Sequence, residues 1–112
     1  MSEKINIKDF TSLDIRVGTI LTAAPAPDAK VPAYHLEIDF GALGTRRSSA
    51  RITDHYRPEE LVGSQILAVV NFPPKQIGSF KSEVLVLGGY EPDGSVKLLR
   101  PDRPVANGAR VR

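Results

Sequence analysis

Two stretches of this 112-residue chain carry side chains suited to binding a polymer. The first, residues 46–51, reads Arg-Arg-Ser-Ser-Ala-Arg, and in a strand its alternation sends Arg47, Ser49 and Arg51 to one face. Guanidinium groups and hydroxyls are good donors to phosphate oxygens. The stretch therefore predicts a phosphate-binding face, although a charged edge strand that resists aggregation would contain the same residues.

The second stretch, residues 71–83, combines two aromatic rings, two lysines, an asparagine and several hydroxyls between two apolar segments. Phe72 and Phe80 are able to stack on nucleic-acid bases. Either ring could instead close the end of a barrel, and we favour this interpretation for Phe72, which directly follows an apolar segment. Lys75 and Lys81 add positive charge, so the stretch is predicted to be a binding loop.

Residues that could perform catalysis or bind a metal are scarce. The chain has no cysteine, which excludes a disulfide scaffold, a thiolate metal site and a cysteine nucleophile. His35 and His55 stand alone, whereas a zinc site needs three or four ligands. No serine lies in a nucleophile elbow with a local base. We therefore predict a protein that is not an enzyme and that uses no metal and no cofactor.

The charge distribution points to a polyanionic partner. Residues 1–45 carry four basic and six acidic side chains, whereas residues 46–112 carry eleven basic and seven acidic ones. A positive field on one part of a small domain attracts polyanions, although a difference of this size also arises by chance. The sequence shows neither a secretory signal nor an apolar run of membrane-spanning length, which with the missing cysteines predicts a cytoplasmic protein without membrane insertion.

The length and the Gly- and Pro-rich composition favour one domain, residues 1–112, built from short strands. Apolar patterning predicts a short helix at 56–62 and strands at 15–24, 34–40, 46–53, 65–72, 84–87 and 96–99. The first five of these strands, with the short helix between the third and the fourth, follow the order of a five-stranded Greek-key OB-fold barrel, an all-β fold. An antiparallel sandwich with one added helix would give the same order.

Two finer expectations concern the first three strands. Gly18 lies inside the first one and suggests a bulge or a sharp bend. A five-residue loop between the second and third strands would place Asp39 opposite Arg47 and His35 opposite Arg51.

The N-terminal segment is more apolar than a free arm should be. Ile5, Ile7, Phe10 and Leu13 must cover another surface, either the end of the barrel or a second copy of the chain. We therefore predict that they form part of a dimer interface.

Several separated motifs, in order, resemble the EMAP-type tRNA-binding domain family. They are residues 14–18 (Asp-Ile-Arg-Val-Gly), the Pro-Glu-Glu-Leu-Val-Gly turn at 58–63, Asn71 and the strand that contains Ser82 and Glu83. Within the family, residues 48–53, 69–74 and 80–88 are similar to the CsaA-type secretion chaperones. This resemblance implies an OB-fold homodimer joined through an N-terminal arm (residues 1–13) and a C-terminal extension (residues 100–112).

The resemblance also implies two kinds of partner, which a basic groove with apolar walls is able to accept together. The leading hypothesis is a chaperone for unfolded or export-bound polypeptides, whose groove residues would be Arg51, Asn71, Phe72, Pro73, Pro74, Phe80 and Ser82. The alternative is a stand-alone, structure-selective tRNA-binding protein, whose contacts would be Arg46, Arg47, Ser49, Arg51, Asn71, Lys75, Lys81 and Ser82.

Overall fold

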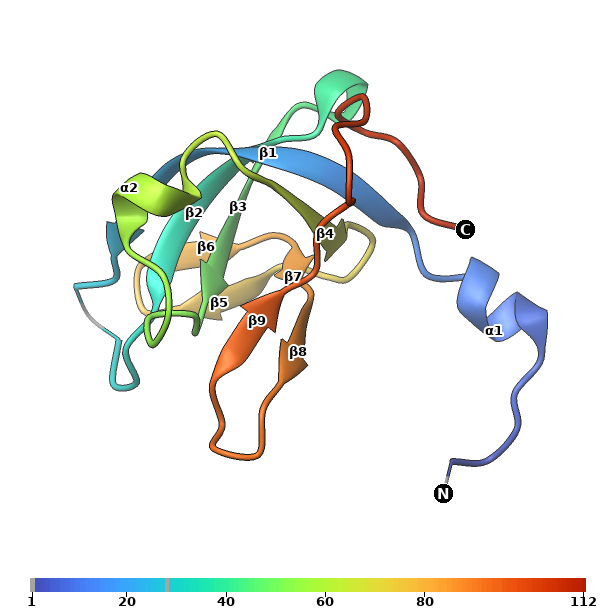
Figure 1. Cartoon of the computed structure of the whole chain (residues 1–112), viewed down its shortest axis with the longest axis horizontal. Helices are drawn as coiled ribbons and strands as arrows, with labels where there is room; N and C mark the ends of the chain where they lie inside the picture. Colours follow the sequence, from blue (N-terminus) through green and yellow to red (C-terminus); the bar gives the residue numbers. More distant parts are fainter. Residues whose placement is uncertain (1, 28) are drawn as a thin grey trace.

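A five-stranded antiparallel sheet, with the strand order β3-β2-β1-β4-β7, dominates the structure, a computed structural model that describes residues 2–27 and 29–112 (Figure 1). Two short hairpins, β5–β6 and β8–β9, extend from it in the described residues. The elements are α1 (Ile7–Thr11), β1 (Ile15–Pro25), β2 (Tyr34–Asp39), η1 (Gly41–Leu43), β3 (Thr45–Ala50), α2 (Pro58–Leu61), β4 (Gln65–Val69), β5 (Lys75–Ile77), β6 (Phe80–Ser82), β7 (Leu85–Val86), β8 (Gly88–Tyr90) and β9 (Val96–Leu98).

The sheet closes into a barrel where β3 meets residues 82–84. The amides of Glu83 and Val84 donate to the Arg47 carbonyl at 2.8 and 3.3 Å. Side chains complete this seam, because Ser48 Oγ donates to the Val84 carbonyl at 2.9 Å and the Ser49 amide donates to Ser82 Oγ at 3.0 Å. The five-stranded OB-fold barrel with a helix between its third and fourth strands is confirmed.

Alternate residues of β2 fill the barrel, as the apolar pattern predicts. Leu36, Ile38 and, directly after the strand, Phe40 are fully buried. Leu61 of α2 is buried in the same cluster, so this short helix anchors itself to the barrel through one leucine. None of the described helices has the length and apolar character needed to cross a membrane.

The glycine in β1 serves close packing rather than a bulge. A Cβ at Gly18 would lie 2.6 Å from Cγ2 of Ile38 and 2.7 Å from Cε1 of Phe40. The irregularity of β1 lies between Ile20 and Thr22, so its expected position at Gly18 is wrong. Gly18 is required because the buried side chains of β2 occupy the space of a side chain.

The expected register between β2 and β3 is also wrong, by two residues. Glu37 lies opposite Arg47, and Asp39 lies opposite Thr45. The strand ends one residue earlier than expected because the Phe40 amide donates to the Gly44 carbonyl at 3.0 Å and closes the turn. A shift of two residues keeps every side chain on its predicted face, so the inward and outward sets are unchanged.

Residues 71–83 are more ordered than the predicted loop. They contain the hairpin β5–β6, which turns at Gly78 with a φ of 60°. The predicted strands at 84–87 and 96–99 are present as β7 and β9, and β9 pairs with the additional strand β8.

Both terminal segments pack near the start of β1. Helix α1 begins after Asn6, whose side chain accepts the Lys8 amide in a capping box with Asp9. The C-terminal segment, red in Figure 1, runs beside β1, where the Val17 amide donates to the Ala109 carbonyl at 2.9 Å and the Val111 amide to the Ile15 carbonyl at 2.8 Å.

Candidate binding groove

An open groove of about 500 Å³ lies beside the barrel seam. Most of its lining comes from residues 49–52, at the end of β3 and just after it, and from residues 82–90, and the rest comes from residues 72–77 and from β9. The lining residues are Ser49, Ala50, Arg51, Ile52, Phe72, Pro73, Lys75, Ile77, Ser82, Glu83, Val84, Leu85, Val86, Gly88, Tyr90 and Val96.

Three large apolar side chains of the groove are exposed to solvent. Phe72 is 44% exposed, Leu85 50% and Tyr90 78%. Side chains of this size gathered around one hollow form the kind of surface that buries apolar groups of a partner. The groove therefore offers apolar burial to a ligand.

The charged residues of the groove leave an excess of positive charge. Glu83 accepts the Arg47 amide at 3.0 Å and lies 4.0 Å from Arg47 Nε, so its carboxylate is already engaged. Arg51 and Lys75 also line the groove, and within the described residues neither forms an ion pair. An acidic group on a ligand would find two cations there.

The groove contains about half of the side chains for which we predict a binding role. Arg51, Phe72, Pro73 and Ser82 of the predicted polypeptide site line it, as do Ser49 and Lys75 of the predicted RNA site. Ser82 also accepts the Ser49 amide, so its hydroxyl supports the seam. Pro74, Lys81, Arg46, Arg47, Phe80 and Asn71 lie outside the lining.

Phe80 belongs to a separate cluster on the outer face of the barrel. Its ring stacks on His35 with 3.7 Å between the ring centroids and 11° between the planes. The Arg47 guanidinium lies 5.0 Å from the centroid of the same ring. These contacts hold the β5–β6 hairpin against β2 and β3, and the His35 ring occupies a stacking position on Phe80.

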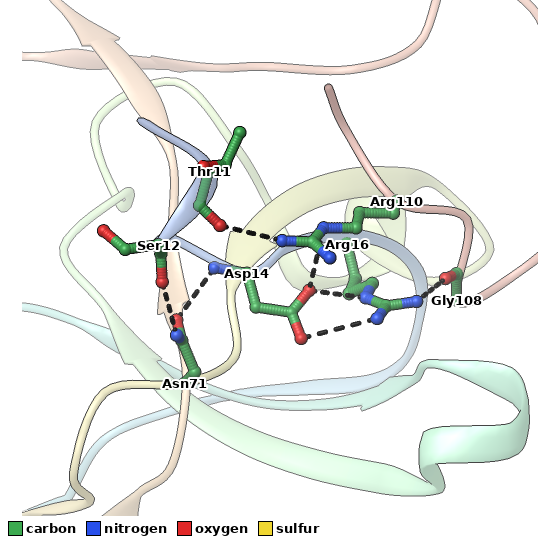
Figure 2. Close-up of polar contacts among 7 residues, drawn as sticks. All are labelled: Thr11, Ser12, Asp14, Arg16, Asn71, Gly108 and Arg110. Carbon is green, nitrogen blue, oxygen red and sulfur yellow. Dashed lines mark hydrogen bonds and ion pairs between the residues drawn. The ribbon is translucent and has the colours of Figure 1, made fainter. Parts of the chain in front are cut away.

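Asn71 joins the loop after β4 to the N-terminal segment. Its Oδ1 accepts the Asp14 amide at 2.9 Å and its Nδ2 donates to the Ser12 carbonyl at 2.8 Å, as Figure 2 shows. Both ends of the side-chain amide are therefore used within the chain.

Asp14 is the centre of a second set of contacts in Figure 2. Its carboxylate pairs with Arg16, with 2.6 Å between Nε and Oδ1, and lies 3.8 Å from Arg110 Nε. Arg16 donates to the Gly108 carbonyl and Arg110 to the Thr11 carbonyl, each at 2.9 Å. The motif at residues 14–18 thus ties both terminal segments to the barrel.

A smaller hollow of about 330 Å³ lies between α1 and the C-terminal segment. It is lined by Ile7, Phe10, Thr11, Leu13, Arg110, Val111 and Arg112. Three of the four residues predicted for a dimer interface, Ile7, Phe10 and Leu13, therefore line the same hollow. The fourth, Ile5, lies outside the lining and, like Ile7, is 72% exposed.

Ile77, Leu85 and Tyr90 are among the groove residues that the sequence did not single out. Tyr90 could have been identified, because it follows two glycines and directly precedes the turn at residues 91–94, so it is not part of an alternating apolar pattern that would bury it. Ile77 belongs to β5 and Leu85 to β7, two strands of different sheets that both contribute to the groove lining. In the described part of the chain, no group of three or more His, Cys, Asp or Glu side chains is arranged to hold a metal ion.

Comparisons with known proteins agree with this geometry. Residues 15–110 match a family model described as "Putative tRNA binding domain". The chain is 39% identical over 112 residues to a methionine–tRNA ligase of Porphyromonas gingivalis, and it spans 16% of the length of that ligase.

Two solved structures are similar over almost the whole chain. The chaperone CsaA from Bacillus anthracis is 53% identical, with a TM-score of 0.94, and the match covers 98% of this chain and 100% of that one. The CsaA chaperone protein from Picrophilus torridus is 49% identical, with a TM-score of 0.91, covering 97% and 100% of the two chains.

Proposed function

Because the chain belongs to the tRNA-binding domain family and, within it, to the CsaA group, we propose that it is a chaperone that binds non-native or export-bound polypeptides in the cytoplasm. The observation that carries this proposal is the groove beside the barrel seam. An extended polypeptide would bury apolar side chains against Phe72 and Leu85, gaining about 25 cal/mol for each Å² removed from water. Arg51 and Lys75 would pair with acidic residues of the same segment.

The proposed binder is a homodimer. Residues 1–112 would form one domain, with the arm at 1–13 and the extension at 100–112 at the interface; Met1 lies outside the described residues. The apolar hollow between α1 and the C-terminal segment, and the exposure of Ile5 and Ile7, support this assignment. Two grooves in a dimer would hold one long polypeptide more tightly than either alone, because the second contact is intramolecular.

The experiment is a light-scattering assay in which a chemically unfolded protein is diluted with and without this chain. We expect the chain to slow aggregation, and we expect Phe72→Ala to reduce that effect several-fold because it removes an exposed apolar wall of the groove. Val62→Ala is the matched control, since Val62 is exposed to a similar extent outside the groove. If a panel of unfolded proteins aggregates unchanged in the presence of the chain, the chaperone proposal fails.

tRNA binding is the second candidate function, supported by the family match and by the similarity to part of a methionine–tRNA ligase. The proposed contacts are phosphate contacts, made by the arginines and lysines of the sequence prediction, because an A-form helix is recognised chiefly by shape and backbone. The residues that carry the charge are Arg46, Arg47, Arg51, Lys75 and Lys81. We expect the tRNA affinity to fall steeply as salt is added. Absence of binding at low salt would reject this function.

A further inference from the structure

Residues 84–90 run along one wall of the groove as an almost continuous extended segment, and β4 and β9 bind only alternate residues of it. The Leu87 amide donates to the Leu67 carbonyl at 2.9 Å, and the Leu87 carbonyl accepts the Leu99 amide at 3.1 Å. Farther along, the Glu91 amide donates to the Ser95 carbonyl at 2.8 Å. The odd-numbered residues thus direct their backbone groups toward the barrel and toward β9.

In an antiparallel ladder, successive residues direct their backbone groups to opposite sides. The amides and carbonyls of Val86, Gly88 and Tyr90 therefore point away from β4 and β9. Val84 shows the same direction at the other end, because its amide donates to the Arg47 carbonyl of β3. Beyond that point β3 no longer covers the segment, and in the described chain no turn, loop or side-chain hydrogen bond reaches the backbone of these three residues.

The groove lies on the side to which these groups point. Val84 directs its amide to β3, and residues 49–52, at the end of β3 and just after it, line the groove together with Val86, Gly88 and Tyr90. Gly88 must remain glycine, because a Cβ at this position would overlap Cγ1 of Val96. We call the backbone of these three residues the Val86–Tyr90 edge.

We propose that the groove binds an extended peptide as an added β-strand along the Val86–Tyr90 edge. The inference rests on the proposed polypeptide-binding function and specifies how the polypeptide is held. An unpaired strand edge is a template for a further strand, and main-chain hydrogen bonds then supply affinity that does not depend on sequence. Such binding suits a protein that must hold many different polypeptides.

The edge favours a peptide over RNA as the occupant. It presents both amides and carbonyls, and a peptide backbone supplies acceptors and donors in the same alternation. RNA also has donors, in its 2′-hydroxyls and base edges, but these do not alternate with its acceptors at the spacing of a β-strand, so RNA would leave groups of the edge without partners, which costs free energy in a desolvated groove. The side chains around the edge indicate which peptide sequence would bind best. Phe72 and Leu85 are apolar, and Arg51 and Lys75 are cations without an ion-pair partner in the described residues. They suit a peptide that alternates apolar and acidic residues.

The test measures amide hydrogen exchange by NMR in the full chain, with an acetylated and amidated hexapeptide of alternating Val and Glu. At a free peptide concentration of about ten times the Kd, we expect exchange at the amides of Val86, Gly88 and Tyr90 to slow about tenfold. The amides of Leu87 and Gly89, already in ladders, should change much less. Unchanged exchange at the three edge amides in the bound state would overturn the inference.

Two N-methylated peptides test the same contact from the ligand side. One carries methyl groups on the Val amides and the other on the Glu amides. Strand addition predicts that one version loses at least tenfold in affinity while the other binds like the parent; equal effects overturn it. If the hexapeptide does not bind at all, the inference also fails, and the aggregation assay decides separately whether the chaperone proposal stands. Slow exchange at the edge in the free protein that becomes fast on dilution would mean that a second copy covers the edge, which contradicts the inference as well.

Discussion

Two lysines of the β5–β6 hairpin, Lys75 and Lys81, differ in their surroundings. Lys75 lines the groove. Lys81 precedes Ser82, the residue that pairs with Lys75 in the hairpin, but it lies outside the groove lining. A cation in the groove is available to a peptide and to RNA. A cation outside the groove is available only to an RNA backbone that extends across the surface.

We therefore expect Lys81→Ala to weaken tRNA binding and to leave peptide binding unchanged, whereas Lys75→Ala weakens both. Loss of one phosphate contact should reduce the slope of log affinity against log salt by about one. Salt titrations of tRNA binding, together with fluorescence polarisation of the labelled hexapeptide, measure the two effects. Lys30→Ala serves as a control for net charge, because Lys30 lies outside both stretches. Equal losses for both ligands with Lys81→Ala would contradict separate binding surfaces.

Gly18 gives a stability prediction for a single residue. The Cβ of Gly18→Ala would overlap Ile38 and Phe40, both fully buried, so we expect the free energy of unfolding to fall by about 1–3 kcal/mol. Gly89→Ala is the control, because a Cβ there meets no atom within 4 Å. Urea denaturation followed by circular dichroism measures both changes. If Gly18→Ala lowers the free energy of unfolding no more than Gly89→Ala does, the side chains of Ile38 and Phe40 move aside without a measurable loss of stability and the prediction is wrong.

The β8–β9 hairpin contains a carboxylate that stabilises its turn. Asp93 Oδ1 accepts Ser95 Oγ at 2.6 Å and the Ser95 amide at 2.9 Å. These hydrogen bonds, with smaller contributions from the charges of His55 and Lys97, lower the pKa of Asp93 below its ordinary value of 3.8. Because the pKa is lower in the folded state, the stabilisation is fully present above the ordinary value and is lost as the pH falls through the folded-state pKa.

Asp93→Asn keeps an acceptor at this turn but removes the titration. We expect the difference in melting temperature between the natural chain and the variant to be constant above about pH 5 and to shrink as the pH falls below 3.8. Thermal scans across this range measure it. Glu60, whose pKa is also lowered, is present in both proteins and cancels in the difference. If the difference in melting temperature stays constant down to pH 2, the pKa of Asp93 is not lowered by folding and the prediction is wrong.

At the scale of elements, the sequence predicts strands whose apolar alternation is strong. The pattern of β2 predicts both the strand and its buried face, because Leu36 and Ile38 must leave water together. The hairpin β5–β6 has no such pattern, since its strands are only three residues long and follow two prolines. Its position depends on contacts such as the Phe80–His35 stack, which join residues far apart in the sequence. The groove could not be predicted from the sequence for the same reason, because its lining residues come from separate segments of the chain.

At the scale of the whole molecule, the proposed homodimer depends on contacts made by the N-terminal arm. The side chains of Ile5 and Ile7 are mostly exposed in a single chain, so replacing both by serine should not disturb its fold. If they lie at the interface, the variant should dissociate at concentrations where the natural chain is dimeric, because burial of two isoleucines contributes about 3–6 kcal/mol to such an interface.

Light scattering coupled to size-exclusion chromatography measures this change. The double variant Val31→Ser, Val62→Ser is the matched control, as both valines are about half exposed and lie outside the N-terminal arm. A dimer of unchanged stability in the isoleucine variant would remove the arm from the interface.

The pairing of β1 has a consequence for how the chain is made. Residues 15–17 are synthesised well before the segments that lie beside them, β4 on one side and residues 109–111 on the other. The hairpin partner β2 follows soon after, but it pairs with the other end of β1. One side of the first part of β1 therefore stays unpaired until β4 has been synthesised, and the other side until residues 109–111 have been synthesised. A protein that we propose to protect unfinished polypeptides is itself an unfinished polypeptide until residues 109–111 have been synthesised.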